Sequence, residues 1–489
     1  MNNNFGTREE TYMQENYDKI GEECGVFAIF NNNADYLNSA RLTYYGLYAL
    51  QHRGQESCGI TVWNGNEMKT HKGMGLVHEV FDNGNISSLD GNVAIGHVRY
   101  STTGSSKPEN AQPIVVKYKK GSLAMAHNGN LVNASELRAK LESMGSIFQS
   151  TNDSEVLVQI IARERINSKN TQEAVLKAMD IIKGAYSIVV MTADKLIAAR
   201  DKQGFRPLCI GKIDDSYVVA SETCALDSVK ATFLRDIEPG EIVVIDKNGV
   251  NSIKDNCGQK HSSCVFEYIY FARTDSIIDN VSVYKARKEA GRQLAKASPV
   301  DADMIIGVPD SGLVSAMGFA EESHIPYGDG LVKNRYIGRT FIQPDQKQRE
   351  DSVNIKLNAL RSEVEGKRIV MIDDSIVRGT TSAKLITMLK HAGARQVHMR
   401  ISSPPFMWPC YFGTDIPSKD QLIACKHSIE EIRQLIGADS LAFLPIDALS
   451  KIVEGLGVNG YCDACFSGNY TVDIPKDTEK IKFDKPFLV

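Results

Sequence analysis

Two adjacent acids and a glycine-containing turn follow a short apolar segment in the C-terminal half of this chain. Residues 369–372 (IVMI) are apolar enough for a buried parallel strand, and Asp373-Asp374-Ser375 follow directly. The turn Arg378-Gly379-Thr380-Thr381 comes next, and a helical pattern begins near Ser382. Carboxylates at a strand end suit a ribose diol or a metal ion, and backbone N–H groups at a helix start suit a phosphate. Such a loop can therefore hold a sugar phosphate at both ends.

The alternative is an ordinary strand-to-helix turn in which an aspartate caps the helix. Capping needs one acid, whereas this loop has two acids and a Gly-Thr-Thr turn. The loop closely resembles the phosphoribosyl pyrophosphate (PRPP) motif of type I phosphoribosyltransferases. The PRPP-binding residues that this resemblance implies are Asp373, Asp374, Ser375, Arg378, Gly379, Thr380 and Thr381.

The elements that must position this loop alternate between helices and buried strands. The pattern predicts helices over residues 284–297, 313–322 and 383–392, and strands over residues 304–308, 369–372 and 396–401. This alternation is typical of βαβ units and therefore of a parallel sheet.

Two further segments of this half resemble parts of the same transferases. Ser311 lies in a turn that in related transferases faces pyrophosphate and metal, so Ser311, Asp373 and Asp374 are candidate Mg²⁺ contacts. A helix N-cap is the alternative role of Ser311. The basic segment 333–341 resembles the loop that closes over PRPP, with Lys333 and Tyr336 as expected contacts, and the alternative is a solvated basic loop.

Short β-rich segments dominate the chain from Cys24 to about residue 255. The pattern predicts strands over residues 24–30, 93–98, 123–126, 187–191, 196–199, 217–220 and 241–245, and helices over residues 155–166 and 172–182. A mixed α+β domain with antiparallel pairing follows from this order. The polar stretch 246–261 is interpreted as a connection between domains.

Four separated segments of this half carry residues of chemical interest. Taken singly, Cys24 is an ordinary buried thiol, Arg99 a surface ion-pair partner, Asn128-Gly129 a turn and Asp153 a helix cap. In their joint order these segments resemble the glutaminase domain of class II glutamine amidotransferases, which are N-terminal-nucleophile hydrolases. The similarity runs from Cys24 to about residue 240.

The resemblance implies a role for each of these residues in glutamine hydrolysis. The thiol of Cys24 attacks the side-chain amide, while the Arg99 guanidinium binds the α-carboxylate and Asp153 the α-ammonium group. The Asn128 side chain and the Gly129 N–H stabilise the resulting oxyanion.

The general base of such a site is an α-amino group, whose pKa is roughly 7.7–8.0. The nitrogen of Cys24 is an amide while residues 1–23 precede it, and an amide cannot act as a base. We therefore expect residues 1–23 to be a leader peptide that is removed after Glu23, as in family members that cleave theirs autocatalytically.

Four cysteines form a further candidate group. Cys462 and Cys465 make a C-x-x-C motif, and Cys264 and Cys410 lie far upstream. Spacing alone leaves redox activity, zinc and an iron–sulfur cluster open. The surrounding sequences resemble the subgroup of glutamine PRPP amidotransferases with a leader peptide and a [4Fe–4S] cluster, and the resemblance implies that these four thiolates bind it.

The two halves together resemble the amidophosphoribosyltransferases over nearly the whole chain. The implied fold is an αββα sandwich of the N-terminal-nucleophile hydrolase type over residues 24–255, then an α/β type I phosphoribosyltransferase domain with a parallel sheet and a C-terminal cluster-binding segment over residues 256–489. The implied reaction takes glutamine, PRPP and water to 5-phosphoribosylamine, glutamate and pyrophosphate, the first step of purine biosynthesis. Mg²⁺ as cofactor, purine nucleotides as feedback ligands and a homotetramer are implied as well.

Other functions share parts of this pattern. Another glutaminase-coupled enzyme would not need the loop from Asp373 to Thr381, and a PRPP-binding regulator would not need Cys24 with its partners. An iron–sulfur sensor with vestigial domains is the third alternative.

The overall composition limits the expected partners and cellular location of the protein. The chain has 489 residues and a net charge of −4, which favours neither nucleic acid nor a membrane surface as partner. No apolar run approaches the roughly 20 residues needed to cross a bilayer, and the polar, acidic N-terminus is unlike a signal peptide. We expect a cytoplasmic protein whose ten cysteines are not paired as disulfides.

Overall fold

The computed structural model describes residues 24–32, 38–100, 104–334, 357–414, 416, 418–453 and 460–474. The expected leader, residues 1–23, and Tyr336 lie outside these ranges. The described chain forms two compact units: a larger one from residues 24–289, 408–416 and 447–474, and a smaller one from residues 290–407 and 418–446. The larger unit therefore includes residues 256–289, 408–416 and 447–474, which were predicted to belong to the second domain.

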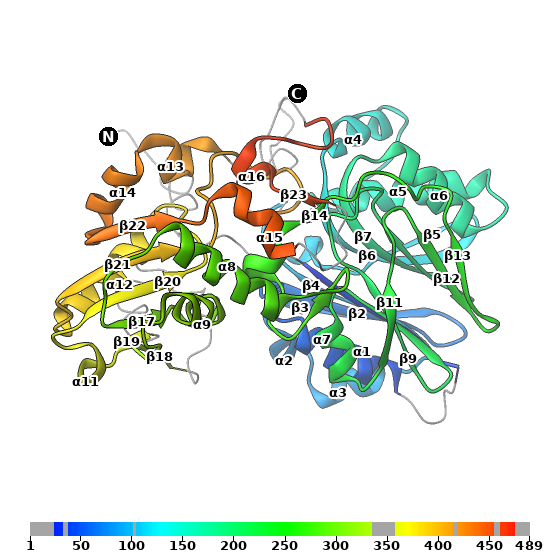
Figure 1. Cartoon of the computed structure of the whole chain (residues 1–489). Coiled ribbons are helices and arrows are strands. Elements are labelled where there is room, and N and C mark those ends of the chain that lie inside the picture. The colour runs from blue at the N-terminus through cyan, green and yellow to red at the C-terminus, as the bar shows by residue number, and fades with distance from the viewer. Residues whose placement is uncertain are drawn as a thin grey trace, which may run out of the picture. The chain divides into compact units, whose positions relative to one another are not determined.

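Two antiparallel sheets form the centre of the larger unit (Figure 1). The first has seven strands, in the order β11 (Thr232–Asp236), β9 (Cys209–Ile213), β10 (Ser216–Ala220), β1 (Gly25–Phe30), β4 (Val93–Arg99), β2 (Ser57–Trp63) and β3 (Met68–Met74). The second has six, in the order β13 (Gly249–Ile253), β12 (Ile242–Asp246), β8 (Leu196–Arg200), β7 (Gly184–Met191), β6 (Gly121–Leu131) and β5 (Ile114–Tyr118).

Apolar side chains from the two sheets pack against one another and form a shared core. Helix α1 (Ser39–Ala49) and helix α7 (Thr223–Ser228) pack on the outer face of the first sheet. Helices α4 (Ala134–Ser143), α5 (Asp153–Ile166) and α6 (Thr171–Ile181) cover the outer face of the second, as Figure 1 shows. The expected αββα sandwich is therefore confirmed.

The interpretation of residues 246–261 as a connection is wrong in part. Residues Gly249–Ile253 form strand β13, which pairs antiparallel with β12 at the edge of the second sheet. This strand exposes most of its side chains, so its sequence lacks the apolar alternation that marks a half-buried strand.

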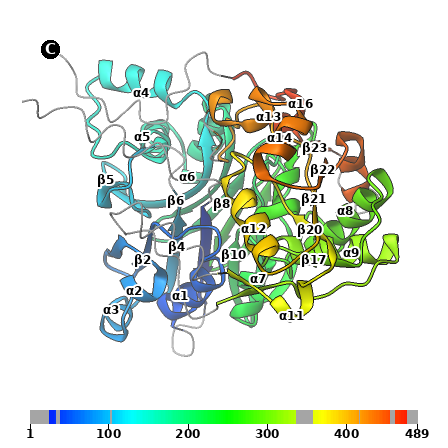
Figure 2. The same ribbon diagram turned by 90° about the vertical axis from the view of Figure 1, so that its left-hand side faces the viewer.

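The smaller unit contains the expected parallel sheet (Figure 2). Its four strands run in the order β17 (Met304–Gly307), β20 (Arg368–Asp373), β21 (Gln396–Ile401) and β22 (Ser440–Phe443). Helices α9 (Gly312–Ser323), α12 (Thr380–His391) and α14 (Ile429–Ile436) belong to this unit, and the apolar residues of α12 and α14 join its core. Among the described helices, none has both the length and the apolar character needed to span a bilayer.

Candidate active site

Strand alternation places the predicted glutaminase residues in the layer between the two sheets of the larger unit. Val26 and Ala28 of β1 and Val93 and Ile95 of β4 belong to the core between the sheets. Because every second side chain of a strand points to the same face, Cys24 and Arg99 face the same layer. Ala124 and Ala126 of β6 also belong to this core, which places Asn128 on that face.

Cys24 precedes β1 at the level where β4 ends, since Gly25 pairs with Val98. Its thiol is buried and lies 3.4 Å from the carbonyl oxygen of Tyr100, to which it donates. Burial raises the pKa of the Cys24 thiol to about 11, against the opposing effect of the nearby Arg99 guanidinium. The thiol is therefore protonated near neutral pH and needs a base to become a nucleophile.

The predicted binding residues for the two α-groups of glutamine are both buried near Cys24. The Arg99 guanidinium forms an ion pair with Glu56 and donates to the carbonyl oxygens of Ser105, at 3.4 Å, and Gly104, at 3.5 Å. Asp153 is the first residue of α5, and its Oδ2 accepts from the backbone N–H of Leu131 at 2.9 Å. The Arg99 guanidinium and the Asp153 carboxylate thus lie near the thiol, and together they can bind the carboxylate and the ammonium group of an amino acid.

Asn128 and Gly129 lie side by side on β6. The Asn128 side chain is buried, and its Nδ2 has no hydrogen-bond partner among the described residues. A buried amide donor without a partner is unusual, because leaving it unpaired costs about 1–3 kcal/mol. Gly129 has φ +143°, and a Cβ there would lie 2.1 Å from the carbonyl oxygen of Ala185, so only glycine fits. Asn128 Nδ2 is therefore a buried donor that is available to a bound acceptor.

Sequence reasoning assigned no role to a buried ionic network that holds the backbone of Cys24. The Nε of Arg53 donates to the Cys24 carbonyl oxygen at 3.0 Å. Its other nitrogens form ion pairs with Glu222 at 2.6 Å and Glu267 at 2.7 Å, and Arg206 also pairs with Glu267. These partners lie far apart in the sequence, so no local sequence signal could have found them.

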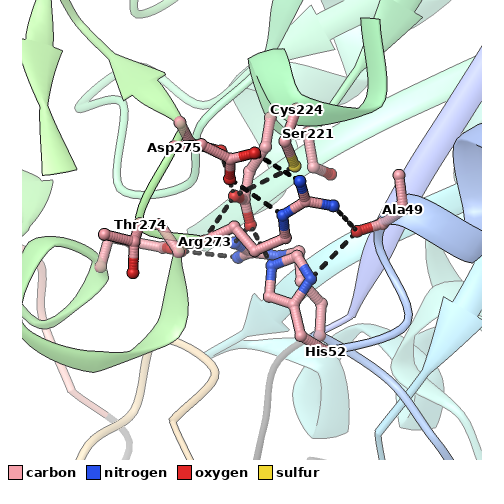
Figure 3. Close-up of polar contacts among 12 residues, drawn as sticks. Ala49, His52, Ser221, Cys224, Arg273, Thr274 and Asp275 are labelled. Atoms are coloured by element: carbon pink, nitrogen blue, oxygen red, sulfur yellow. Dashed lines mark hydrogen bonds and ion pairs between the residues drawn. The ribbon is translucent and has the colours of Figure 1, made fainter. Parts of the chain in front are cut away.

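Figure 3 shows the outer part of this network. His52 Nδ1 and Arg273 Nη1 both contact the carbonyl oxygen of Ala49, at 3.2 Å and 3.4 Å, and the Arg273 side chain forms an ion pair with Asp275. Burial opposes ionisation of Glu222, but His52 and Arg53 beside it hold its pKa well below the usual range. Glu222 is therefore a permanent anion that joins several separate segments of the larger unit.

The predicted PRPP loop lies at the carboxyl end of β20 in the smaller unit. Asp373 and Asp374 are both buried, and the Asp374 carboxylate accepts from Ser375 Oγ at 2.6 Å and from Ser311 Oγ at 2.5 Å. The turn that carries Ser311 is adjacent because Gly312 packs against the end of β20, where a Cβ would lie 2.3 Å from the Ile372 carbonyl oxygen. The structure thus brings Ser311 together with the acid pair.

The rest of the loop forms the start of α12. Gly379 has φ +88° and precedes the first helical residue, Thr380, so the turn opens directly into a helix N-terminus. Arg378 donates to Gln421 Oε1 at 2.5 Å. Lys333 forms an ion pair with Asp310, in the turn before Ser311. Exposed backbone N–H groups at such a helix start can bind a phosphate.

The four predicted cluster cysteines lie near one another in the larger unit. Cys264 of β14 (Ser263–Cys264) is the register partner of Cys462 in β23 (Tyr461–Cys462). Burial raises the pKa of Cys465 well above its usual value, and the neighbouring thiols of Cys410, Cys264 and Cys462 raise it further. In the part of the chain that the structure describes, no group of three or more His, Cys, Asp or Glu side chains is arranged to hold a metal ion.

Comparison with known proteins identifies both expected domains. Residues 97–228 match the glutamine amidotransferase domain, and residues 274–402 match the phosphoribosyl transferase domain. Fold and sites together define a class of enzyme in which a glutaminase is joined to a phosphoribosyltransferase. The chain belongs to the amidophosphoribosyltransferase family. The amidophosphoribosyltransferase of Bacillus subtilis is 50% identical over 94% of this chain and 96% of its own length, and that of Archaeoglobus fulgidus is 49% identical over 92% and 98%.

Two solved structures are similar over the same extent. Glutamine PRPP amidotransferase from B. subtilis, in complex with ADP and GMP, is 49% identical with a TM-score of 0.87, covering 94% of this chain and 99% of that one. A structure described as the allosteric regulatory enzyme of purine biosynthesis is 48% identical with a TM-score of 0.87, covering 95% of this chain and 100% of that one.

Proposed function

We propose that this chain transfers ammonia, released from glutamine, to C1 of PRPP, giving 5-phosphoribosylamine, glutamate and pyrophosphate. This is the first step of purine biosynthesis. The observation that carries the proposal is that one chain of this family contains both halves of the chemistry. A buried thiol shares a layer with an amide donor that has no partner among the described residues, and an acid pair precedes the start of a helix.

The glutaminase half would begin with the Cys24 thiol attacking the glutamine side-chain amide. Its raised pKa, about 11, means that the thiol proton must be taken by a base. The base we propose is the α-amino group of Cys24, which exists only after cleavage of the peptide bond that follows Glu23. Asn128 Nδ2 and the Gly129 N–H would then stabilise the oxyanion, while Arg99 and Asp153 hold the α-groups.

Arg99 already carries a carboxylate partner, Glu56, which bears on how glutamine binds. A guanidinium has five N–H donors, so it can bind a second carboxylate while keeping the first. Glu56 therefore acts as the orienting partner of Arg99.

The transferase half would bind PRPP at the loop after β20. Asp373 and Asp374 would accept hydrogen bonds from the ribose hydroxyls, and the turn from Arg378 to Thr381 with the start of α12 would hold the 5-phosphate. Lys333 would contribute positive charge toward the pyrophosphate, and so would the segment with Tyr336, which lies outside the described residues. Binding in this orientation presents C1 to ammonia, so most of the catalysis is positioning.

Magnesium fits the oxygen donors of this loop. Mg²⁺ prefers oxygen ligands and usually takes only one or two carboxylates, the remaining positions being water or substrate phosphate. Asp373, Asp374 and Ser311 would hold the ion and its waters. When bound, Mg²⁺ balances the negative charge of the pyrophosphate group.

The cysteine group has the ligand type of a [4Fe–4S] cluster, which is bound by four thiolates. The thiols of Cys264, Cys410 and Cys462 lie close enough to Cys465 to raise its pKa, and Cys410 also raises the pKa of Cys462, which supports a shared ligand. Cys264, Cys410, Cys462 and Cys465 would hold the cluster, which when bound cross-links the segments that carry them.

We base our proposals on nucleotide regulation and oligomeric state on membership of the family. The related B. subtilis enzyme was solved with ADP and GMP, which supports purine nucleotides as feedback ligands. We also propose a homotetramer in the cytoplasm, with glutamine and PRPP as substrates.

The test is PRPP-dependent release of pyrophosphate, with glutamine or ammonia as nitrogen source, together with the release of glutamate when glutamine is used. Cys24→Ala is expected to abolish glutamine use and to keep ammonia use, because ammonia bypasses the thiol. Cys425→Ala is the matched control, since the Cys425 thiol donates to the Met407 carbonyl oxygen of its own unit and has no role in either predicted site, and both activities should persist. Loss of both activities in Cys24→Ala would contradict the proposed division between the two halves.

A further inference from the structure

The segments on either side of the glutamine site approach each other closely at one point. Residues 104–110 follow Arg99, and residues 149–152 lead into Asp153. Gly104 has φ +82°, and a Cβ there would lie 2.7 Å from the Thr151 carbonyl oxygen. The two segments are therefore in van der Waals contact at backbone level.

The side chain of Asn110 joins these two segments. It is 1% exposed, and its Nδ2 donates to the Ser105 carbonyl oxygen at 2.8 Å and to Thr151 Oγ1 at 2.9 Å. Its Oδ1 accepts from the Thr151 backbone N–H at 3.0 Å, and its own carbonyl oxygen accepts from Asn152 Nδ2 at 3.3 Å. Both polar atoms of the Asn110 side chain are therefore hydrogen-bonded. We call this set of bonds, which joins Asn110 to Ser105, Thr151 and Asn152, the clamp.

Each end of the clamp leads directly to a predicted glutamine contact. The Ser105 carbonyl oxygen that accepts from Asn110 also accepts from the Arg99 guanidinium at 3.4 Å. At the other end, Asn152 is the N-cap of α5, and its Oδ1 accepts from the Ser154 N–H at 3.0 Å, which fixes the helix turn that starts with Asp153.

We propose that Asn110 is a positioning residue for glutamine, which sets the distance between the Arg99 guanidinium and the Asp153 carboxylate. It touches neither the substrate nor the thiol. An amino acid must satisfy both groups at once, because its α-carboxylate and α-ammonium group are attached to one carbon. Asn110 thereby determines selectivity for an amide that carries an α-amino acid over a simple amide. The inference rests on the proposed glutaminase function.

The experiment compares glutamine with glutaramate, the same carboxylate amide without the α-amino group. For Asn110→Ala, kcat/KM for glutamine should fall at least tenfold, mainly through KM, because the two contacts no longer hold a common spacing. For glutaramate, which uses only the Arg99 contact, kcat/KM should fall less than threefold. Ammonia-dependent synthesis should stay within twofold of wild type.

Two further variants keep the result interpretable. Thr151→Val removes one of the clamp's hydrogen bonds while keeping the backbone bond, so KM for glutamine should rise about threefold. Asn133→Ala is the matched control, because the Asn133 side chain also bridges two segments, with hydrogen bonds to Ile181 and Lys183 instead of to the clamp residues. Its KM for glutamine should not change.

Three results would overturn the inference: equal losses for glutamine and glutaramate, an unchanged KM in both clamp variants, or a raised KM in Asn133→Ala as well. Failure of the wild-type protein to use glutamine at all would instead refute the proposed function. If Asn110→Ala does not fold, the Thr151→Val comparison decides the question alone.

Discussion

The unpartnered amide of Asn128 leads to a prediction about activity and stability together. Asn128→Leu removes the donor and fills its place with an apolar side chain of nearly the same shape. Loss of one oxyanion donor typically lowers kcat by about 10²–10³, or about 2.7–4 kcal/mol of barrier. We expect a loss of that size in glutamine hydrolysis, because Nδ2 is buried and has no other partner among the described residues.

Folding stability should change in the opposite direction or stay constant. A buried donor without a partner destabilises the fold by about 1–3 kcal/mol, and Asn128→Leu removes this penalty. The free energy of unfolding should therefore be unchanged or higher by about 1 kcal/mol, which raises the unfolding midpoint by about 2–4 °C for a unit of this size.

The assay measures glutamine hydrolysis, ammonia-dependent synthesis and thermal unfolding on the same preparations. Asn256→Leu is the matched control, since Asn256 Nδ2 is another buried nitrogen without a partner among the described residues and lies outside the predicted site. It should leave all three measurements near wild type or slightly raise the midpoint. The reasoning is refuted if glutamine hydrolysis falls less than tenfold in Asn128→Leu, or if ammonia-dependent synthesis falls equally.

Three other predictions concern separate parts of the chain. Gly129→Ala should lower the free energy of unfolding by at least about 2 kcal/mol in a denaturant titration, because the added Cβ would lie 2.1 Å from a carbonyl oxygen of β7. Asp374→Asn should lower ammonia-dependent synthesis by about 100-fold, while glutamine hydrolysis without PRPP stays within threefold; equal losses would contradict separate sites. Burial and the nearby Asp279 carboxylate raise the pKa of Asp236 to about 7, so the folded state disfavours its ionisation. Stability is then lost as pH rises from about 4 to 7, and Asp236→Asn should raise the unfolding midpoint above pH 7 but not near pH 4.

Local sequence was enough to predict most elements that carry the sites. The strand before Asp373, the helix after Asp153 and the helix after Gly379 all appear in the structure, because each has a clear apolar period and a capping or turn residue. The parallel sheet of the smaller unit followed from the same alternation. Helix α12 begins at Thr380, three residues before the predicted range 383–392, because part of the turn belongs to the helix.

Contacts between distant residues could not be predicted in this way. Arg53 binds Glu222 and Glu267, which are 169 and 214 positions away, and no local pattern selects such partners. The clamp of Asn110 was missed for the same reason, since its partner Thr151 is 41 positions away. The four cysteines were grouped from a family resemblance, and only the pairing of β14 with β23 places two of them side by side.

The pairing of β1 with β4 has a consequence for how the nucleophile is specified. Gly25 through Phe30 are held in one register against β4, so the direction of the Cys24 side chain is decided by counting residues back from that ladder. Inserting or deleting one residue between Cys24 and Phe30 would turn the thiol toward α1 on the other side of the sheet, even with every side chain of the site intact. Substitution of Cys24 therefore tests the need for a thiol. The face of the sheet to which that thiol points depends on the number of residues between Cys24 and the β1–β4 ladder, and an insertion or deletion tests it.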